Sequence, residues 1–173
     1  MDAARPGRCP CCGAASRPLG RGLALHGHGL RARTVIVQGG EKPQITEILA
    51  RRYVCLVCDA VVLVVPSDVA RRHLYTLTMI AMALAAWSHG GESARVLRAR
   101  HSPFCVVGSA VPGWPSLVRW SRTAAKLWPR VGPLACGSPR GLAHVLSAKL
   151  SAFSPVPTGR VLDDVVAGAV HAT

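Results

Sequence analysis

Acidic residues are scarce in this sequence. Only 8 of 173 residues are Asp or Glu, against 21 Lys and Arg, which gives a formal net charge of +13. After Glu92 the only carboxylates are Asp163 and Asp164, which are adjacent. Phosphoryl-transfer catalysis of the transposase type needs a cluster of carboxylates that holds two metal ions. The sequence therefore excludes a catalytic core of that kind.

Other signatures of enzymes and membrane proteins are missing as well. There is no GxSxG, P-loop or HExxH motif, and "GSPRG" (137–141) is read as a plain turn. The best candidate for a membrane span, residues 77–87, is only 11 residues long, shorter than the roughly 18 apolar residues that a span needs. The N-terminus lacks the apolar region of a signal peptide. We expect a non-enzymatic, cytoplasmic protein that has no membrane partner.

The basic residues are mostly arginine and lie mostly before residue 131. Eighteen of the 21 are Arg, the side chain whose planar fork suits phosphate and guanine contacts. A GC-rich genome would explain the arginine codons, but it would not explain why the acids are missing too. We expect a polyanionic partner, with duplex DNA favoured, and hence association with the nucleoid.

Two pairs of cysteines stand out in the sequence. "CPCCG" contains Cys9 and Cys12, and "VCLVCD" contains Cys55 and Cys58, each pair in CxxC spacing. Thiolates at i and i+3 on a tight turn, here called a knuckle, supply two of the four ligands that zinc takes in a tetrahedron. A hairpin between the knuckles would bring the four sulfurs together. The sequence predicts one structural Zn²⁺ ion, in a closed site with no position left for catalysis.

Other uses of the thiols are less favoured. A redox CxxC is expected where a helix follows a strand, and neither pair has that context. Cys11, His26 or His28 remain alternative ligands, although four thiols already satisfy zinc. The isolated Cys105 and Cys136 are interpreted as small buried hydrophobes.

Hydrophobic periodicity predicts an α+β chain with a division at Pro66. Strand-like runs at 33–39, 48–55 and 60–66, broken by Gly-rich stretches, indicate antiparallel β-structure in residues 1–66, a small four-cysteine zinc ribbon. Helical spacing follows in residues 70–91, where Leu74, Leu77, Ala81 and Leu84 recur and Gly90-Gly91 ends the segment, then at 92–101, and from Pro115 to Pro129. Residues 67–130 are thus predicted to be an all-helical, helix-turn-helix-like DNA-binding domain. Residues 131–173 are expected to be a helical or partly disordered extension.

The helix that begins at Pro115 is the candidate recognition helix. Its apolar positions form one stripe, and its other positions carry basic residues but no acid, whereas a solvated surface helix would normally mix in Glu. Such a helix suits docking in the major groove. The apolar stripe comprises Leu117, Trp120, Ala124 and Leu127. The candidate DNA contacts on this and the preceding helices are Arg119, Arg122, Lys126, Arg71, Arg72, Arg95 and Arg98.

The order of these motifs resembles a known family. "CPCCG…HGHGLRAR…RRYVCLVCDAVVLVVPSDVARRHLY…ALAAW…GWPSLVRW" resembles the N-terminal zinc-ribbon and helix-turn-helix segments of bacterial insertion-sequence transposases. It is also similar to short bacterial proteins that carry this segment alone. The resemblance covers about residues 7–130 and matches Cys9, Cys12, Cys55, Cys58, Pro66, Arg72, Tyr75 and Trp120. It implies DNA binding, at transposon ends or as a regulator derived from a mobile element.

Two further classes of function remain open. Zinc ribbons also bind RNA or ribosomes, and they dock other proteins in the transcription machinery. A homodimer or a separate transposase subunit is a possible partner of this chain.

Overall fold

Three strands and five α-helices make up the part of the chain that this computed structural model describes, residues 4–70, 72–104 and 113–173. The mixed α+β composition predicted from the sequence is thus confirmed. The strands are β1 (Leu25–Gly39), β2 (Lys42–Cys55) and β3 (Val61–Val64). The helices are α1 (Leu77–His89), α2 (Ala94–His101), α3 (Pro115–Leu127), the short 3₁₀ helix η1 (Pro129–Val131), α4 (Pro139–Ser151) and α5 (Val161–His171).

The strands form one sheet in the order β1-β2-β3. A two-residue loop that begins with Gly40, at φ 76°, joins β1 to β2, a conformation that glycine adopts without strain. β2 pairs with β3 in antiparallel register, with Tyr53 opposite Val62. β1 is longer than the sequence predicted, because it begins at Leu25 and includes the glycines that we expected to break it.

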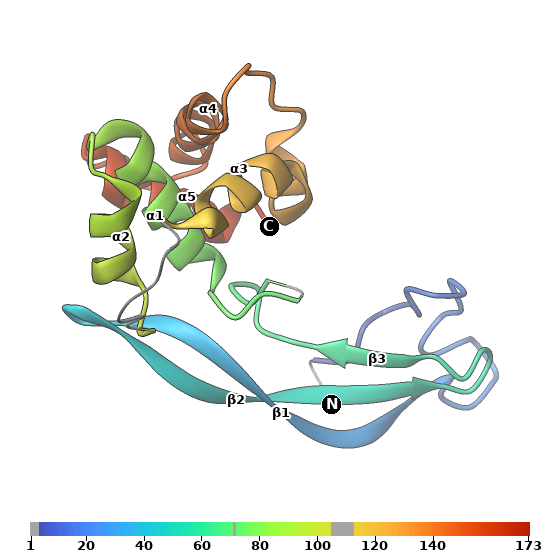
Figure 1. The fold of residues 1–173 in the computed structure, drawn as a ribbon. Coiled ribbons are helices and arrows are strands. Elements are labelled where there is room, and N and C mark those ends of the chain that lie inside the picture. Colours follow the sequence, from blue (N-terminus) through green and yellow to red (C-terminus); the bar gives the residue numbers. More distant parts are fainter. Residues whose placement is uncertain (1–3, 71, 105–112) are drawn as a thin grey trace. The chain divides into compact units, whose positions relative to one another are not determined.

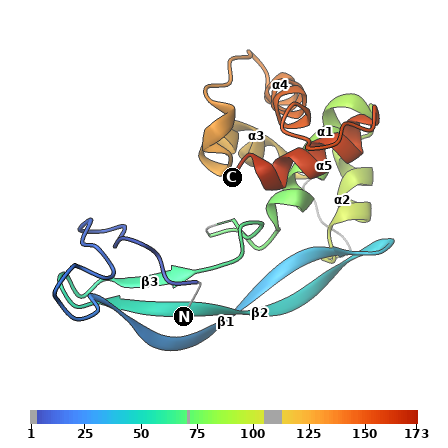
Figure 2. The same cartoon turned by 180° about the vertical axis from the view of Figure 1, so that it is seen from behind.

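The contacts divide the chain into two units, which we describe separately. The cysteine unit comprises Met1–Thr34 and Glu47–Pro66, and the helical unit comprises Val35–Thr46 and Ser67–Thr173. The tip of the β1–β2 hairpin is therefore assigned to the helical unit. Figure 2 shows β3 beside β2, and the N-terminal segment and the turn after β2 close together at one end of these strands.

Within the helical unit, all five α-helices share one hydrophobic core. α1 packs against α4 and α5, these two pack against each other, and α3 packs against α4 (Figure 1). Leu84 of α1, Leu146 of α4 and Val165 of α5 are fully buried in this core. The C-terminal region, which the sequence predicted to be a helical or partly disordered extension, contains α4 and α5 and contributes to the same core as α1 and α3. None of the described helices combines the length and the apolar character needed to cross a membrane.

Aromatic side chains fix the position of α3 in the core. Trp120 packs edge-on against Tyr75 and Trp114, with ring centroids 5.1 Å from each. Such pairs contribute about 0.5–1.5 kcal/mol beyond their burial. At the end of α3, the indole N–H of Trp128 donates a hydrogen bond to the Ala169 carbonyl of α5 at 3.0 Å. The tryptophans therefore hold α3 to the rest of the helical unit.

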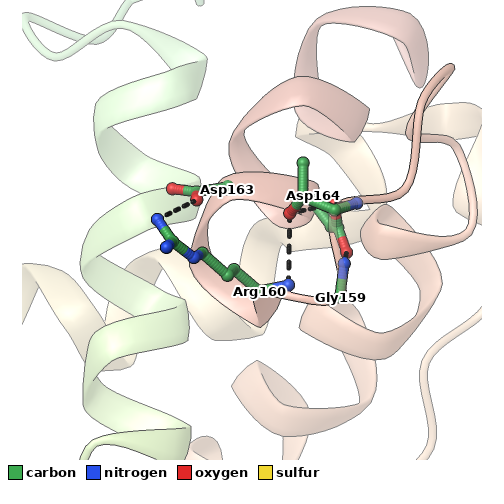
Figure 3. Close-up of polar contacts among 5 residues, drawn as sticks. Gly159, Arg160, Asp163 and Asp164 are labelled. Carbon is green, nitrogen blue, oxygen red and sulfur yellow. Dashed lines mark hydrogen bonds and ion pairs between the residues drawn. The ribbon is translucent and has the colours of Figure 1, made fainter.

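The start of α5 is stabilised by a buried carboxylate, Asp164 (Figure 3). Asp164 accepts hydrogen bonds from the backbone amide and hydroxyl of Thr158, at 2.7 and 2.9 Å, and from the Gly159 amide at 3.2 Å. The adjacent Asp163 is exposed and forms a 3.9 Å ion pair with Arg160. The two neighbouring acids therefore differ in role: Asp164 orders the loop before α5, whereas Asp163 lies at the surface.

Candidate functional site

The four predicted cysteines lie together in the cysteine unit. The sulfurs of Cys9, Cys12, Cys55 and Cys58 all lie within 4.8 Å of one another. The Sγ atoms of Cys9 and Cys58 are 3.8 Å apart, and those of Cys12 and Cys55 are 3.7 Å apart. A disulfide would need about 2.05 Å, so these thiols are not bonded to each other.

Both knuckles have the same backbone structure. In the first, the amide of Cys9 donates to Ala14 O and the amide of Gly13 donates to Cys9 O, each at 2.9 Å. In the second, the amide of Cys55 donates to Ala60 O at 3.0 Å, and the amide of Asp59 donates to Cys55 O at 2.8 Å. The two CxxC segments therefore present their sulfurs from equivalent turns, as expected of two halves of one site.

A small core supports the first cysteine of each pair. Cys9 and Cys55 are buried and pack with Leu25 and Tyr53, which are fully buried. Val62 of β3 packs against the same cluster. Because this core is small, the unit has little apolar burial to stabilise it, and cross-linking of the four sulfurs by a metal would add to its stability.

The electrostatics of the cluster favour one thiolate but not several. The backbone amides of Cys12 and Cys11 face the Cys9 sulfur and lower the pKa of Cys9 to about 7. At Cys58 the amide of Ala60 acts in the same direction, but the neighbouring thiols and burial outweigh it and raise the pKa of Cys58. A second negative charge beside the first is costly, and a bound cation removes that cost.

The donor set and its dimensions fit a tetrahedral metal ion. Metal–sulfur bonds of about 2.3 Å in a tetrahedron place the sulfurs roughly 3.8 Å apart. The Cys9–Cys58 and Cys12–Cys55 pairs lie at this separation, and the other pairs of sulfurs lie within 4.8 Å. Four sulfur donors select zinc or iron over magnesium or calcium, which take oxygen ligands. The four cysteines can therefore hold one metal ion.

The alternative ligands lie outside this cluster. Cys11 is exposed, and His26 and His28 are exposed on β1, where the His26 ring contacts Leu23 O at 2.8 Å. Cys136 is exposed too, which corrects the expectation that it is buried; it precedes α4 in an irregular segment. Cys105 lies outside the described residues.

The helical unit carries the second candidate site, the outer face of α3. Leu117, Trp120 and Ala124 are buried, as the sequence predicted, and Leu127 is partly buried. The predicted DNA contacts on α3, Arg119, Arg122 and Lys126, are all exposed. Among the described residues no carboxylate forms an ion pair with any of these three. α3 thus has an apolar inner face and a basic outer face.

The other candidate DNA contacts occupy two different places. Arg95 is exposed and Arg98 is half-buried, both on α2. Arg72 is exposed in the segment before α1, and Arg71 lies outside the described residues.

A pocket of about 500 Å³ lies in the helical unit, on one side of α3. It brings together Arg72, Arg119 and Lys126, but it does not include Arg122, Arg95 or Arg98. Sequence reasoning missed His73 and Thr123, since nothing local distinguishes them from other polar residues. The lining residues are Ala70, Arg72, His73, Leu77, Arg119, Thr123, Lys126 and Leu127.

Comparison with known proteins found no family model, no curated protein and no solved structure that matches this chain. Its function is therefore inferred from the geometry of the cysteine cluster and of α3.

Proposed function

We propose that this chain is a zinc-stabilised protein that binds duplex DNA and has no catalytic core of its own. The main support for the proposal is that Arg119, Arg122 and Lys126 are all exposed on one face of α3. Among the described residues, none of the three has an acidic partner. Exposed cations without counter-charges on one helix are expected on a surface that binds a polyanion.

The metal in this proposal is a structural zinc ion. Four thiolates fill the tetrahedron, so no position remains for water or substrate, and the ion would serve only to fold the cysteine unit. Iron takes the same sulfur donors, and metal analysis of the purified protein distinguishes the two.

Duplex DNA is favoured over RNA because the basic surface lies on a regular α-helix. An α-helix fits the major groove of B-form DNA, whereas the major groove of A-form RNA is too narrow for side chains to read. We include in the proposal a relation to the DNA-binding segments of insertion-sequence transposases, supported by the cysteine and tryptophan motifs. Catalysis would then belong to a separate subunit, since this sequence has too few carboxylates.

The test replaces the three basic residues of α3 together. In Arg119→Ala, Arg122→Ala, Lys126→Ala, the slope of log affinity against log salt on duplex DNA should fall by about 0.9 for each phosphate that the variant no longer neutralises. A base-reading arginine would instead cost about 1–3 kcal/mol and relax the sequence preference.

The matched control removes the same three charges elsewhere, in Arg17→Ala, Arg21→Ala, Arg140→Ala, all exposed in the structure. This control variant should bind duplex DNA with the affinity of the wild type and keep most of the slope of log affinity against log salt. The proposal fails if the α3 variant, folded and metal-loaded, binds duplex DNA as the wild type does. Competition with structured RNA provides a further arm, because preferential displacement by RNA would favour the RNA-binding alternative.

A further inference from the structure

The pocket beside α3 concentrates positive charge. Arg72, Arg119 and Lys126 line it, and all three side chains are exposed, so the pocket opens to solvent. Neither of the segments that line it, residues 70–77 and 115–127, contains an acidic residue. Three like charges around one opening repel each other, and an anion in the pocket relieves that repulsion.

The helical register of α3 decides which basic residues reach the pocket. Arg119, Thr123 and Lys126 are spaced i, i+4 and i+7 and form one stripe along the helix, and all three line the pocket. Arg122 projects from the other side of this stripe and does not line the pocket. The basic face of α3 is therefore divided into a pocket side and an outer side.

Arg72 adopts a backbone conformation that is unfavourable for an arginine. Its φ is +62°, in the left-handed region that residues other than glycine and asparagine seldom occupy. Strained residues of this kind persist where the surrounding structure holds them, and they cluster at binding sites.

Hydrogen bonds on both sides hold this segment in place. Before Arg72, the Asp68 carboxylate accepts bonds from the amide and the hydroxyl of Thr78, both at 2.8 Å. After it, the Ile36 amide donates to Leu74 O at 2.7 Å, and the Ile36 carbonyl accepts from the Thr76 amide at 3.1 Å. The nearest acid in the sequence is thus engaged with α1, and the strained arginine is anchored from both directions.

We propose that this pocket binds one phosphate group through Arg72, Arg119 and Lys126, and that the group is a backbone phosphate of duplex DNA. The inference rests on the proposed DNA binding and assigns these residues to positioning of the DNA, since phosphate contacts fix register without reading sequence. Guanidinium forks match the oxygens of a phosphate, and lysine adds a point charge.

The first arm of the test uses inorganic phosphate on the full, metal-loaded chain. Arginine side-chain NMR signals are followed during titration with phosphate, against chloride at equal ionic strength. The signals of Arg72 and Arg119 should shift as phosphate is added and stop shifting once the phosphate site is saturated. Arg72→Gly removes the guanidinium and suits the positive φ, so it should fold normally and bind phosphate roughly tenfold more weakly. The control Arg140→Ala, exposed and outside the pocket, should bind as the wild type does.

The second arm measures duplex DNA binding over a range of salt concentrations. Arg72→Gly removes one of the three cations that contact the phosphate in the pocket, so its slope should be lower than that of the wild type by up to about 0.9, and all duplex sequences should be weakened equally.

The outcomes separate this inference from the proposed function. If wild-type protein binds DNA and Arg72→Gly keeps both affinity and slope, the inference is wrong and the DNA-binding proposal stands. If phosphate shifts the pocket signals but the protein does not bind DNA, the phosphate site stands, whereas DNA as its source and the proposed function are both wrong. If phosphate shifts nothing in the pocket, the phosphate site itself is overturned.

Discussion

Asp59 has in the second knuckle the left-handed backbone conformation that Gly13 has in the first, with φ values of 56° and 73°. Both residues follow the second cysteine of their pair, and both donate their amide to the carbonyl of the first cysteine. The two CxxC segments are thus equivalent in backbone, although only one carries the glycine that this conformation favours.

We expect the conformation at Asp59 to limit which residues that position accepts. Asp59→Gly should keep the metal affinity of the wild type or raise it, because glycine has no penalty at this φ. Asp59→Val should weaken it roughly 5- to 30-fold, corresponding to about 1–2 kcal/mol for a left-handed L-residue. Competition with a chelator measures both. Equal affinities in the two variants would show that backbone strain at Asp59 does not matter for the site.

Removal of one ligand should have a different effect from removal of the bystander thiol. Cys55→Ser is expected to lose the ion and unfold the cysteine unit, because a structural metal supplies folding free energy directly. Cys11→Ser should retain one ion per chain, since Cys11 lies outside the cluster. Metal analysis of both purified proteins checks this. A full metal load in Cys55→Ser, or none in Cys11→Ser, would contradict the ligand assignment.

Gly168 allows α5 to approach α4, and a larger residue there should be destabilising. A Cβ at this position would clash with the carbonyl oxygen of Leu150, a backbone atom that can move only if the helices shift. We expect Gly168→Ala to lower the free energy of unfolding by about 1–3 kcal/mol.

Tryptophan fluorescence during urea unfolding measures this change in the helical unit, which contains all 4 tryptophans. The control is Gly137→Ala, where an added Cβ meets nothing within 4 Å and the change should stay within about 0.5 kcal/mol. Similar losses of unfolding free energy in Gly168→Ala and Gly137→Ala would show that the close approach of α5 to α4 is not the cause of the destabilisation.

Asp164 should make the helical unit sensitive to acid. The Thr158 amide, the Thr158 hydroxyl and the Gly159 amide together outweigh burial and lower the pKa of Asp164 below its usual value of 3.8. The folded state then binds fewer protons than the unfolded state, so the stabilisation is fully present above that usual value. It is lost as the pH falls through the lower native pKa.

The measurement is a pH series of melting temperatures followed by tryptophan fluorescence. Asp164→Asn should melt at a lower temperature at neutral pH and lose less stability than the wild type on acidification. Asp163→Asn is the matched control, since its ion pair is exposed and such pairs contribute little. The same melting temperature in Asp164→Asn and Asp163→Asn at neutral pH would rule out the role assigned to the buried carboxylate.

The features that sequence predicted best are those set by local spacing. The two CxxC pairs indicated a four-cysteine cluster, which the structure confirms for Cys9, Cys12, Cys55 and Cys58. Pro115 marked the start of α3, and its apolar stripe was predicted because helical periodicity alone determines which residues are buried.

Features that depend on main-chain pairing or on tertiary packing were not predicted. Residues 26–32 of β1 are all exposed, so they show no alternation of polar and apolar side chains, and hydrogen bonding to β2 defines the strand instead. The pocket combines Arg72 with Arg119 and Lys126 from distant parts of the sequence. Only the folded helical unit brings them together.

The hydrogen bond from Trp128 to Ala169 joins residues 41 positions apart. During synthesis, Trp128 therefore leaves the ribosome well before the residue to which it bonds. Domains generally fold as units while the chain emerges from the ribosome, the N-terminal parts first. The cysteine unit has all its residues by Pro66, so its four cysteines could take up a metal ion while translation continues. The helical unit instead has to wait for Val165 and Ala169, and until then the apolar surfaces of α1 and α4 that pack against α5 stay uncovered on the nascent chain.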